Sequence, residues 1–254
     1  MPEFILHSII AGIIASIACG LGVLPLAIKG INPQKHTGIA YSVAGGLMFA
    51  ASVYNLILPG LTISSLSISL STAAPVIGGI ILGALFLWQT DRYLSPQRLE
   101  QSNWKKYGNK AQLLIFIAMA VHSIPEGVAV GVGYSSETVY ENELGNYIAL
   151  AIALHNIPEG LAVGVPLRAT GATLFKCFIA AFLTSLPQPI AAVPAAYVSW
   201  LFQPLMPILM GFAAGAMIFL VILELVPEAL NTTSTTKVAW SFTIGFCAMI
   251  LVQV

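Results

Sequence analysis

Long apolar runs separated by short polar segments dominate this chain of 254 residues. A membrane-spanning helix needs about 20 mainly apolar residues, and eight stretches approach or exceed that length. They cover approximately residues 4–28, 38–58, 73–90, 112–134, 147–167, 173–200, 205–226 and 238–254. The pattern predicts an all-α polytopic membrane protein, with residues 1–254 forming a single transmembrane domain.

The composition agrees with this prediction. The chain is 57% hydrophobic and only 8% charged, with a mean hydropathy of +0.89. Soluble domains carry about 25% charged residues, so the lipid bilayer is the expected surroundings, and no nucleic-acid partner is expected. The cysteines Cys19, Cys177 and Cys247 sit on separate segments without a Cys-x-x-Cys pair, so neither a disulfide framework nor a thiolate zinc site is predicted.

The basic residues are distributed on one side of the predicted bundle. With eight helices, all of them fall in or beside the loops that join helices one to two, three to four, five to six and seven to eight. Basic residues mark the cytoplasmic side, so both termini are expected on the periplasmic side of a bacterial inner membrane. The outward loop at 135–146 carries Glu137, Glu141 and Glu143, which either gather cations or are simply solvated. The basic residues are Lys29, Lys35, Arg92, Arg98, Lys105, Lys106, Lys110, Arg168, Lys176 and Lys237.

Two segments of the chain repeat one another, and we call this pair the motif repeat. The sequence His-Ser-Ile-Pro-Glu-Gly at 122–127 returns as His-Asn-Ile-Pro-Glu-Gly at 155–160. The two copies lie on adjacent helices, which cross the membrane in opposite directions, so the motif is presented twice with inverted polarity. Pro125 and Pro158 are predicted to interrupt their helices, because proline cannot donate a backbone hydrogen bond.

A fainter repeat, which we call the long-range repeat, links the second and seventh helices. Residues 44–49 resemble residues 213–218, and the alternative is a chance similarity of small residues. The two repeats together predict three helices, an inverted pair and three more helices, a 3+2+3 arrangement with inverted repeats. Inverted repeats with a polar site at mid-membrane are typical of secondary transporters.

The motif places a histidine and a glutamate on one helix face, because residues four apart share a face. The pairs are His122 with Glu126 and His155 with Glu159. No lysine or arginine lies at that depth, and a bare carboxylate buried in hydrocarbon is strongly disfavoured. Two imidazoles and two carboxylates suit zinc or a similar divalent ion. The alternative is that these side chains only hydrogen-bond one another and hold the helices together.

Other polar or polarisable residues lie in the apolar runs, and each has a structural alternative such as core packing or satisfaction of the backbone. The candidate ligands beside the repeated motif are Ser123, Asn156 and Met48. The candidates for lining an ion path are Asn55, Gln188 and Glu224. Asn55 occupies the position that matches Glu224 in the long-range repeat.

On these motifs the chain resembles the ZIP (Zrt-, Irt-like protein) family of divalent metal transporters, and most of all its prokaryotic GufA-like branch. The resemblance covers essentially the whole chain. It implies uptake of metal toward the cytoplasm, with Zn²⁺ as the usual cargo, Fe²⁺, Mn²⁺ or Cd²⁺ as others, and no prosthetic group. It also implies an elevator-like slide of helices one, four, five and six against the rest. The site that it implies, often binuclear, comprises His122, Ser123, Glu126, His155, Asn156 and Glu159, with Met48 joining it.

The chain departs from the family pattern at two positions. Ser123 stands where the family usually has asparagine, and Gln188 stands where relatives often have glutamate. Both changes make a second metal position less negative. We therefore expect one strong site, built from His122, Glu126, His155 and Glu159. The second metal site is expected to be weak or absent.

The expected partners are divalent metal ions and the lipid bilayer, and a homodimer is left open. No phosphate-binding Gly-x-x-x-x-Gly-Lys-[Ser/Thr] loop occurs, so no ATP-driven engine is expected. One alternative is a transporter or channel for another cation or a proton-coupled substrate. An intramembrane metalloenzyme is disfavoured, because hydrolytic zinc helices read His-Glu-x-x-His, and the chain is not expected to be an enzyme.

Overall fold

The computed structural model describes residues 2–28, 33–63, 67–94, 109–140 and 143–252, and the regular structure within them is entirely helical. The predicted all-α fold class is therefore confirmed. The basic loop at 95–108, Lys29 and Glu141 lie outside the described residues.

The described chain forms a succession of long helices joined by short turns. Two short 3₁₀-helices, η1 (Leu24–Ala27) and η4 (Gln203–Leu205), lie in or beside these connections. Two π-helical turns, η2 (Ser52–Ile57) and η5 (Val221–Leu225), lie within continuous helical stretches. The α-helices are α1 (Glu3–Leu21), α2 (Pro33–Ala51), α3 (Leu58–Thr62), α4 (Leu70–Leu94), α6 (Asn109–Tyr140), α7 (Leu144–Ala169), α8 (Leu174–Ser185), α9 (Pro187–Leu201), α10 (Met206–Leu220), α11 (Val226–Thr232) and α12 (Thr235–Leu251).

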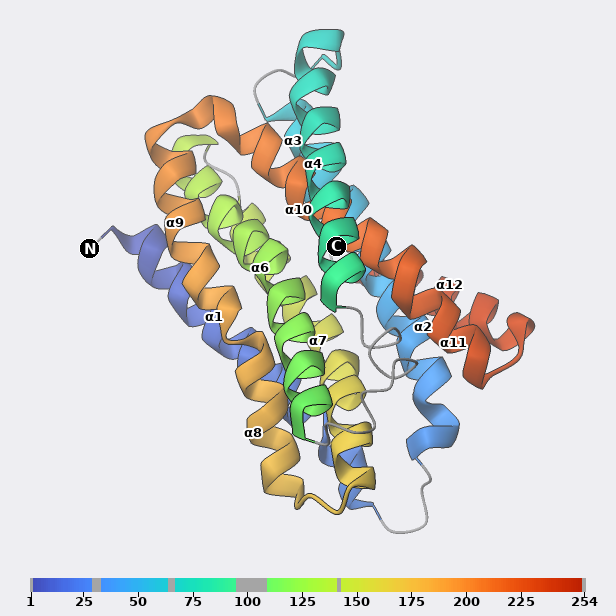
Figure 1. Cartoon of the computed structure of the whole chain (residues 1–254). Coiled ribbons are helices and arrows are strands. Elements are labelled where there is room, and N and C mark those ends of the chain that lie inside the picture. Colours follow the sequence, from blue (N-terminus) through green and yellow to red (C-terminus); the bar gives the residue numbers. More distant parts are fainter. Residues whose placement is uncertain (1, 29–32, 64–66, 95–108, 141–142, 253–254) are drawn as a thin grey trace.

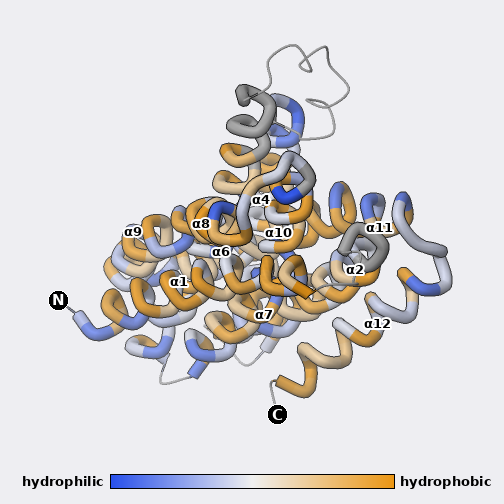
Figure 2. Tube along the Cα trace, turned by 90° about the horizontal axis from the view of Figure 1, so that it is seen from below, coloured by the Kyte–Doolittle hydropathy of each residue, from blue (hydrophilic) through white to orange (hydrophobic). Residues whose placement is uncertain are grey.

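Most of these helices are suited to a bilayer. Within the described residues, six helical stretches are long and apolar enough to cross a membrane, and they run from 24 to 30 residues. The 32 residues of α6 and the shorter apolar helix α12, with 17 residues, account for the two other predicted spans. Figure 2 shows apolar residues along most of the helices and hydrophilic residues mainly near their ends. The chain is an integral membrane protein.

The helices form two groups. In one group α1, α6, α7, α8 and α9 pack on one another, and in the other α12 and α11 pack on α2 while α4 packs on α10. Figure 1 shows the first group on one side of the molecule and the second group on the other. The groups meet where α2 contacts α7 and α10 contacts α6.

The two π-helical turns lie at matching positions of the long-range repeat. In the register that aligns residues 44–49 with residues 213–218, Ser52, the first residue of η2, corresponds to Val221, the first residue of η5. A π-turn is a rare local departure from the α-helix and is often found at functional sites. Two such turns in one register support the inverted repeat of the second and seventh helices over a chance similarity.

The long-range repeat also relates α1 to the α8–α9 segment, which the sequence comparison missed. A Cβ atom at Gly160 of α7 would overlap the carbonyl oxygen of Cys19, and one at Gly127 of α6 would overlap that of Gln188. Gly127 and Gly160 correspond in the motif repeat, and Cys19 and Gln188 correspond in the register of the long-range repeat. The glycines therefore let each motif helix approach one backbone, in two matching contacts.

The prolines of the motif repeat lie inside continuous helices, whereas Pro187 lies at a helix start. The predicted interruptions at Pro125 and Pro158 are wrong, because α6 and α7 continue through these residues. Each proline removes one backbone hydrogen bond, and in hydrocarbon the remaining backbone groups favour the unbroken helix. A break occurs instead beside Gln188, since α8 ends at Ser185 and α9 begins at Pro187.

Candidate metal site

A cavity of about 180 Å³ lies between the two groups of helices, where α2, α6, α7 and η5 meet. A single water molecule needs about 10–15 Å³ measured in this way, so the cavity has room for an ion with several waters. Its polar and sulfur-containing lining residues are Tyr41, Met48, Met119, His122, His155, Glu159, Glu224 and Glu228. The rest of the lining is apolar.

One histidine of the repeated motif faces the second group of helices across this cavity. His122 is 3% exposed, and its Nε2 atom lies 3.6 Å from Oε1 of Glu224 in η5. Neither ring nitrogen of His122 makes a hydrogen bond within the described residues, and Oε1 of Glu224 makes none either. Buried polar atoms are nearly always paired, so these three atoms are available to a ligand.

The other motif histidine lines the cavity and also belongs to a buried hydrogen-bond network. Nε2 of His155 lies 3.3 Å from Oε1 of Glu126, and the amide of Gln188 donates a hydrogen bond to the second carboxylate oxygen of Glu126. Nδ2 of Asn156 donates in turn to Oε1 of Gln188, at 3.1 Å. The network leaves Nδ1 of His155 without a hydrogen bond among the described residues.

The second motif glutamate lines the cavity directly. Glu159 follows His155 by one helical turn, so both side chains project from the same face of α7. Its Oε2 atom makes no hydrogen bond within the described residues. Glu159 therefore adds a carboxylate oxygen to the unpaired nitrogen and oxygen atoms of His122 and Glu224.

Ser123 and Asn156 tie the motif helices to their neighbours. Oγ of Ser123 donates to the backbone carbonyl of Thr184 in α8 at 3.0 Å, and Nδ2 of Asn156 donates to that of Ala15 in α1 at 3.1 Å. The donors correspond in the motif repeat and the acceptors in the long-range repeat, so the two bonds occupy equivalent positions in the inverted repeats. Neither residue lines the cavity, and their predicted role as ligands stays a prediction.

The structure brings some predicted residues together and separates others. Within the described residues, no three side chains of His, Cys, Asp or Glu converge closely enough to hold one metal ion. Asn55 lies away from the cavity, 3% exposed, with Nδ2 3.5 Å from the carbonyl oxygen of Tyr147. We call the cavity of about 180 Å³ the open cavity. The predicted residues that line it are Met48, His122, His155, Glu159 and Glu224, while Glu126 and Gln188 lie in the adjoining hydrogen-bond network.

Three polar or sulfur-containing lining residues were not among the candidates, namely Tyr41, Met119 and Glu228. Helical spacing from the chosen residues would have found two of them. Met119 precedes His122 by three positions and Glu228 follows Glu224 by four, so each shares a face with a residue already singled out. Glu228 is half-buried and lines the cavity.

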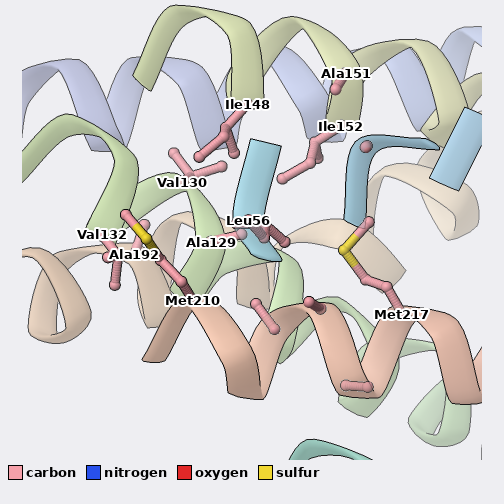
Figure 3. Packing of buried hydrophobic residues seen from close by; sticks show 14 of the residues in the cluster. Leu56, Ala129, Val130, Val132, Ile148, Ala151, Ile152, Ala192, Met210 and Met217 are labelled. Atoms are coloured by element: carbon pink, nitrogen blue, oxygen red, sulfur yellow. The ribbon is translucent and has the colours of Figure 1, made fainter. Parts of the chain in front are cut away.

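The opposite side of the bundle is closed by apolar packing. A second cavity there measures only about 10 Å³, which is at the lower limit for one water molecule. Figure 3 shows the side chains from α6, α7, α10 and η2 that pack in this region. The residues lining the small cavity are Ala51, Asn55, Leu56, Ala129, Ile148, Ala151, Ile152 and Met217.

The predicted acidic loop at 135–146 is partly helical, because α6 continues to Tyr140. Oε1 of Glu137 accepts hydrogen bonds from the backbone nitrogens of Gly145, at 2.8 Å, and Asn146, at 3.3 Å. A carboxylate at a helix N-terminus is stabilised by the unpaired amides and the helix dipole. Glu137 thus has a structural role at the start of α7, in addition to any attraction of cations.

A helical membrane bundle built of inverted halves, with buried imidazoles and carboxylates beside a cavity, has the architecture of a secondary transporter for cations. The family model described as ZIP Zinc transporter matches residues 89–253, more than half of the chain. The chain belongs to the ZIP zinc transporter family.

Individual relatives agree with the family. Zinc transporter GufA of Myxococcus xanthus is 31% identical over 248 residues, covering 93% of this chain and 95% of the relative. Zinc transporter ZIPB of Bordetella bronchiseptica is 30% identical over 253 residues, covering 97% and 80%. A longer Arabidopsis thaliana protein, named provisionally as a zinc transporter, is 37% identical over 243 residues. That match covers 91% of this chain and 36% of the plant protein, so the chain spans about a third of that relative's length.

Proposed function

We propose that this protein transports a divalent transition metal across the membrane, with zinc as the principal cargo. The observation that carries the proposal is the cavity in which His122, Glu159 and Glu224 have ring nitrogens or carboxylate oxygens without hydrogen bonds to the described residues. Acids buried in an apolar bundle require a cation or a proton. The naming of GufA and ZIPB as zinc transporters supports zinc among the divalent ions.

The central site in this proposal lies between the two motif helices. Because His155 and Glu126 now contact one another at 3.3 Å, an ion would separate them and take a nitrogen from one and an oxygen from the other. Two carboxylates then balance the charge of the dication, and imidazole nitrogens complete a ligand set that zinc favours. The proposed ligands are His122, Glu126, His155 and Glu159, with the thioether of Met48 beside them.

The relation between the two cavities supports alternating access. Met48 and Glu224 line the open cavity, and the residues that match them in the long-range repeat, Met217 and Asn55, line the closed one. Movement of the group α1, α6, α7, α8 and α9 against the other helices would close the first cavity and open the second. The central site would then face each side of the membrane in turn.

The orientation follows from the charges near the open cavity. Arg168 follows the lining residue Pro166 by two positions, and Lys237 follows the lining residue Glu228 by nine. We assign this basic end of the bundle to the cytoplasm, which puts both termini on the periplasmic side of a bacterial inner membrane. In this orientation the structure is inward-open, and uptake delivers zinc to the cell.

The direct test is uptake of radioactive zinc into liposomes that contain the purified chain. We expect saturable uptake above that of protein-free liposomes, with competition by Fe²⁺, Mn²⁺ and Cd²⁺ ranking the further cargoes. His122→Ala should lower the initial rate at least about tenfold. Loss of a metal ligand weakens a metal site at least as much as loss of a residue that hydrogen-bonds such a ligand. His7→Ala, which removes an exposed histidine of α1, is the control. Uptake no faster than in protein-free liposomes would contradict the proposal.

The substitution Gln188→Glu is expected to raise the zinc bound at saturation from about one to about two ions per chain. The new carboxylate would lie beside Glu126, and the added negative charge requires a second cation or a proton. The amide of Asn156 can donate to it as it now donates to Gln188. Metal analysis after equilibrium dialysis measures the ratio, with the exposed Gln203→Glu as the matched control. A folded variant that still binds about one ion would show that the missing acid does not limit the second position.

A further inference from the structure

The small closed cavity contains two side chains that the proposed function leaves without a role. Met217 of α10 and Asn55 of η2 line it and are 2% and 3% exposed. Its other lining residues, including Leu56 and Ile152, are apolar. The amide and the thioether are therefore the groups in this lining that could serve as metal ligands.

Six of the eight residues that line the closed cavity correspond to residues that line the open one. The long-range repeat relates Asn55 to Glu224 and Met217 to Met48, and the motif repeat relates Ile152 to Met119. Both repeats thus map one cavity onto the other. The thioether is kept in this mapping, whereas the carboxylate of the open cavity is replaced by an amide.

The two repeats also predict which side chains would lie close together if the closed cavity opened. In the open cavity Nε2 of His122 lies 3.6 Å from Glu224. The residues that match this pair are His155 and Asn55. When the bundle opens on the other side, His155 would therefore lie beside Asn55 and Met217.

We propose that Met217, Asn55 and His155 form an outer station, which binds a borderline or soft divalent cation before it reaches the central glutamates. This proposal rests on the proposed function and deepens it, because it names ligands for the outer half of the path. The station offers a thioether sulfur, an amide oxygen and an imidazole nitrogen. Thioethers favour soft ions, so the station favours Cd²⁺, and to a lesser extent Zn²⁺, over hard cations. Without a carboxylate it holds the ion weakly and passes it on.

The test compares two methionines of the same helix, both labelled in Figure 3. Met217→Leu removes the sulfur from the station, while Met210→Leu makes the same change at a fully buried methionine that lines neither cavity. Initial uptake rates are measured in liposomes with the ion supplied on the side of the closed cavity. For Met217→Leu we expect the half-saturating concentration to rise about tenfold for Cd²⁺ and about threefold for Zn²⁺. For Met210→Leu we expect neither to change.

A second variant is expected to strengthen metal binding at the outer station. Asn55→Glu adds a carboxylate, so the half-saturating concentrations of both ions should fall, and the maximal rate should fall as well because release to the central site is slower. An unchanged ratio between Cd²⁺ and Zn²⁺ in Met217→Leu would overturn the outer station, as would a wild-type protein that carries Zn²⁺ but excludes Cd²⁺. Failure of the wild type to carry either ion would instead overturn the proposed function.

Discussion

Zinc uptake by the Glu126→Gln variant is expected to be at least about 100-fold slower than that of the wild type, although the side chain keeps its size. Glu126 is 1% exposed, contacts His155 and accepts a hydrogen bond from Gln188. With glutamine there, Glu159 would be the only carboxylate left among the proposed ligands to balance a dication. A buried charge without compensation is strongly disfavoured, so the ion would bind poorly. Initial rates of radioactive zinc uptake in liposomes measure the effect.

The matched control for this variant is Glu137→Gln, the same change on the same helix. Glu137 caps the N-terminus of α7 through two backbone amides, and a glutamine carbonyl can accept these bonds. We expect its uptake to stay within about threefold of the wild type, with a small loss of thermal stability. If Glu126→Gln transports zinc as fast as Glu137→Gln, the charge of Glu126 has no part in binding the cargo.

Cross-linking the closed cavity is expected to reduce zinc uptake to the level of protein-free liposomes. Ala51 at the end of α2 and Ala151 of α7 both line this cavity but belong to different groups of helices. In a chain whose three native cysteines are replaced by alanine, a short bifunctional thiol reagent would join Ala51→Cys to Ala151→Cys. The link would hold the outer side shut, and cleavage of the link by a reducing agent should restore uptake.

The control for the cross-link lies within one group of helices. The hydroxyl oxygens of Ser135 in α6 and Ser199 in α9 are 2.6 Å apart, so cysteines at these positions can form a disulfide without a large shift. This link should leave uptake within about twofold of the unlinked chain, because α6 and α9 move together in the proposed mechanism. Equal inhibition by both links, or by neither, would contradict movement of one group against the other.

Much of the lining of the open cavity could be predicted, because polar side chains stand out within apolar runs. His122 and His155 stand out in apolar runs, and helical spacing places a glutamate one turn after each. With eight helices all the basic residues fall on one side of the bundle, which supports the number of helices that the apolar runs predict. Glu224 also stands out as an acid within an apolar run, and the structure places it 3.6 Å from His122.

Other features could not be predicted, because backbone atoms make the decisive contacts. The carbonyl oxygens of Cys19 and Gln188 lie where Gly160 and Gly127 leave space, and a carbonyl contact does not restrict the type of side chain. The repeat between α1 and the α8–α9 segment is therefore faint in the sequence. The π-helical turn that holds Asn55 has no marker residue of its own. Which of the two cavities is open also depends on the packing of whole helices rather than on any single motif.

The π-helical turns make the length of two helices part of the site. If all the residues of Ser52–Ile57 were wound as a regular α-helix, every later side chain of that helix would rotate by about 100°, because the π-helical turn takes up one extra residue. Leu56 would then leave the apolar packing, and Pro59 would face a different neighbour. Relatives that lack one of these π-helical turns should therefore be one residue shorter at η2 or η5, with the rest of that helix in the same orientation, and alignment gaps at either turn should be single residues.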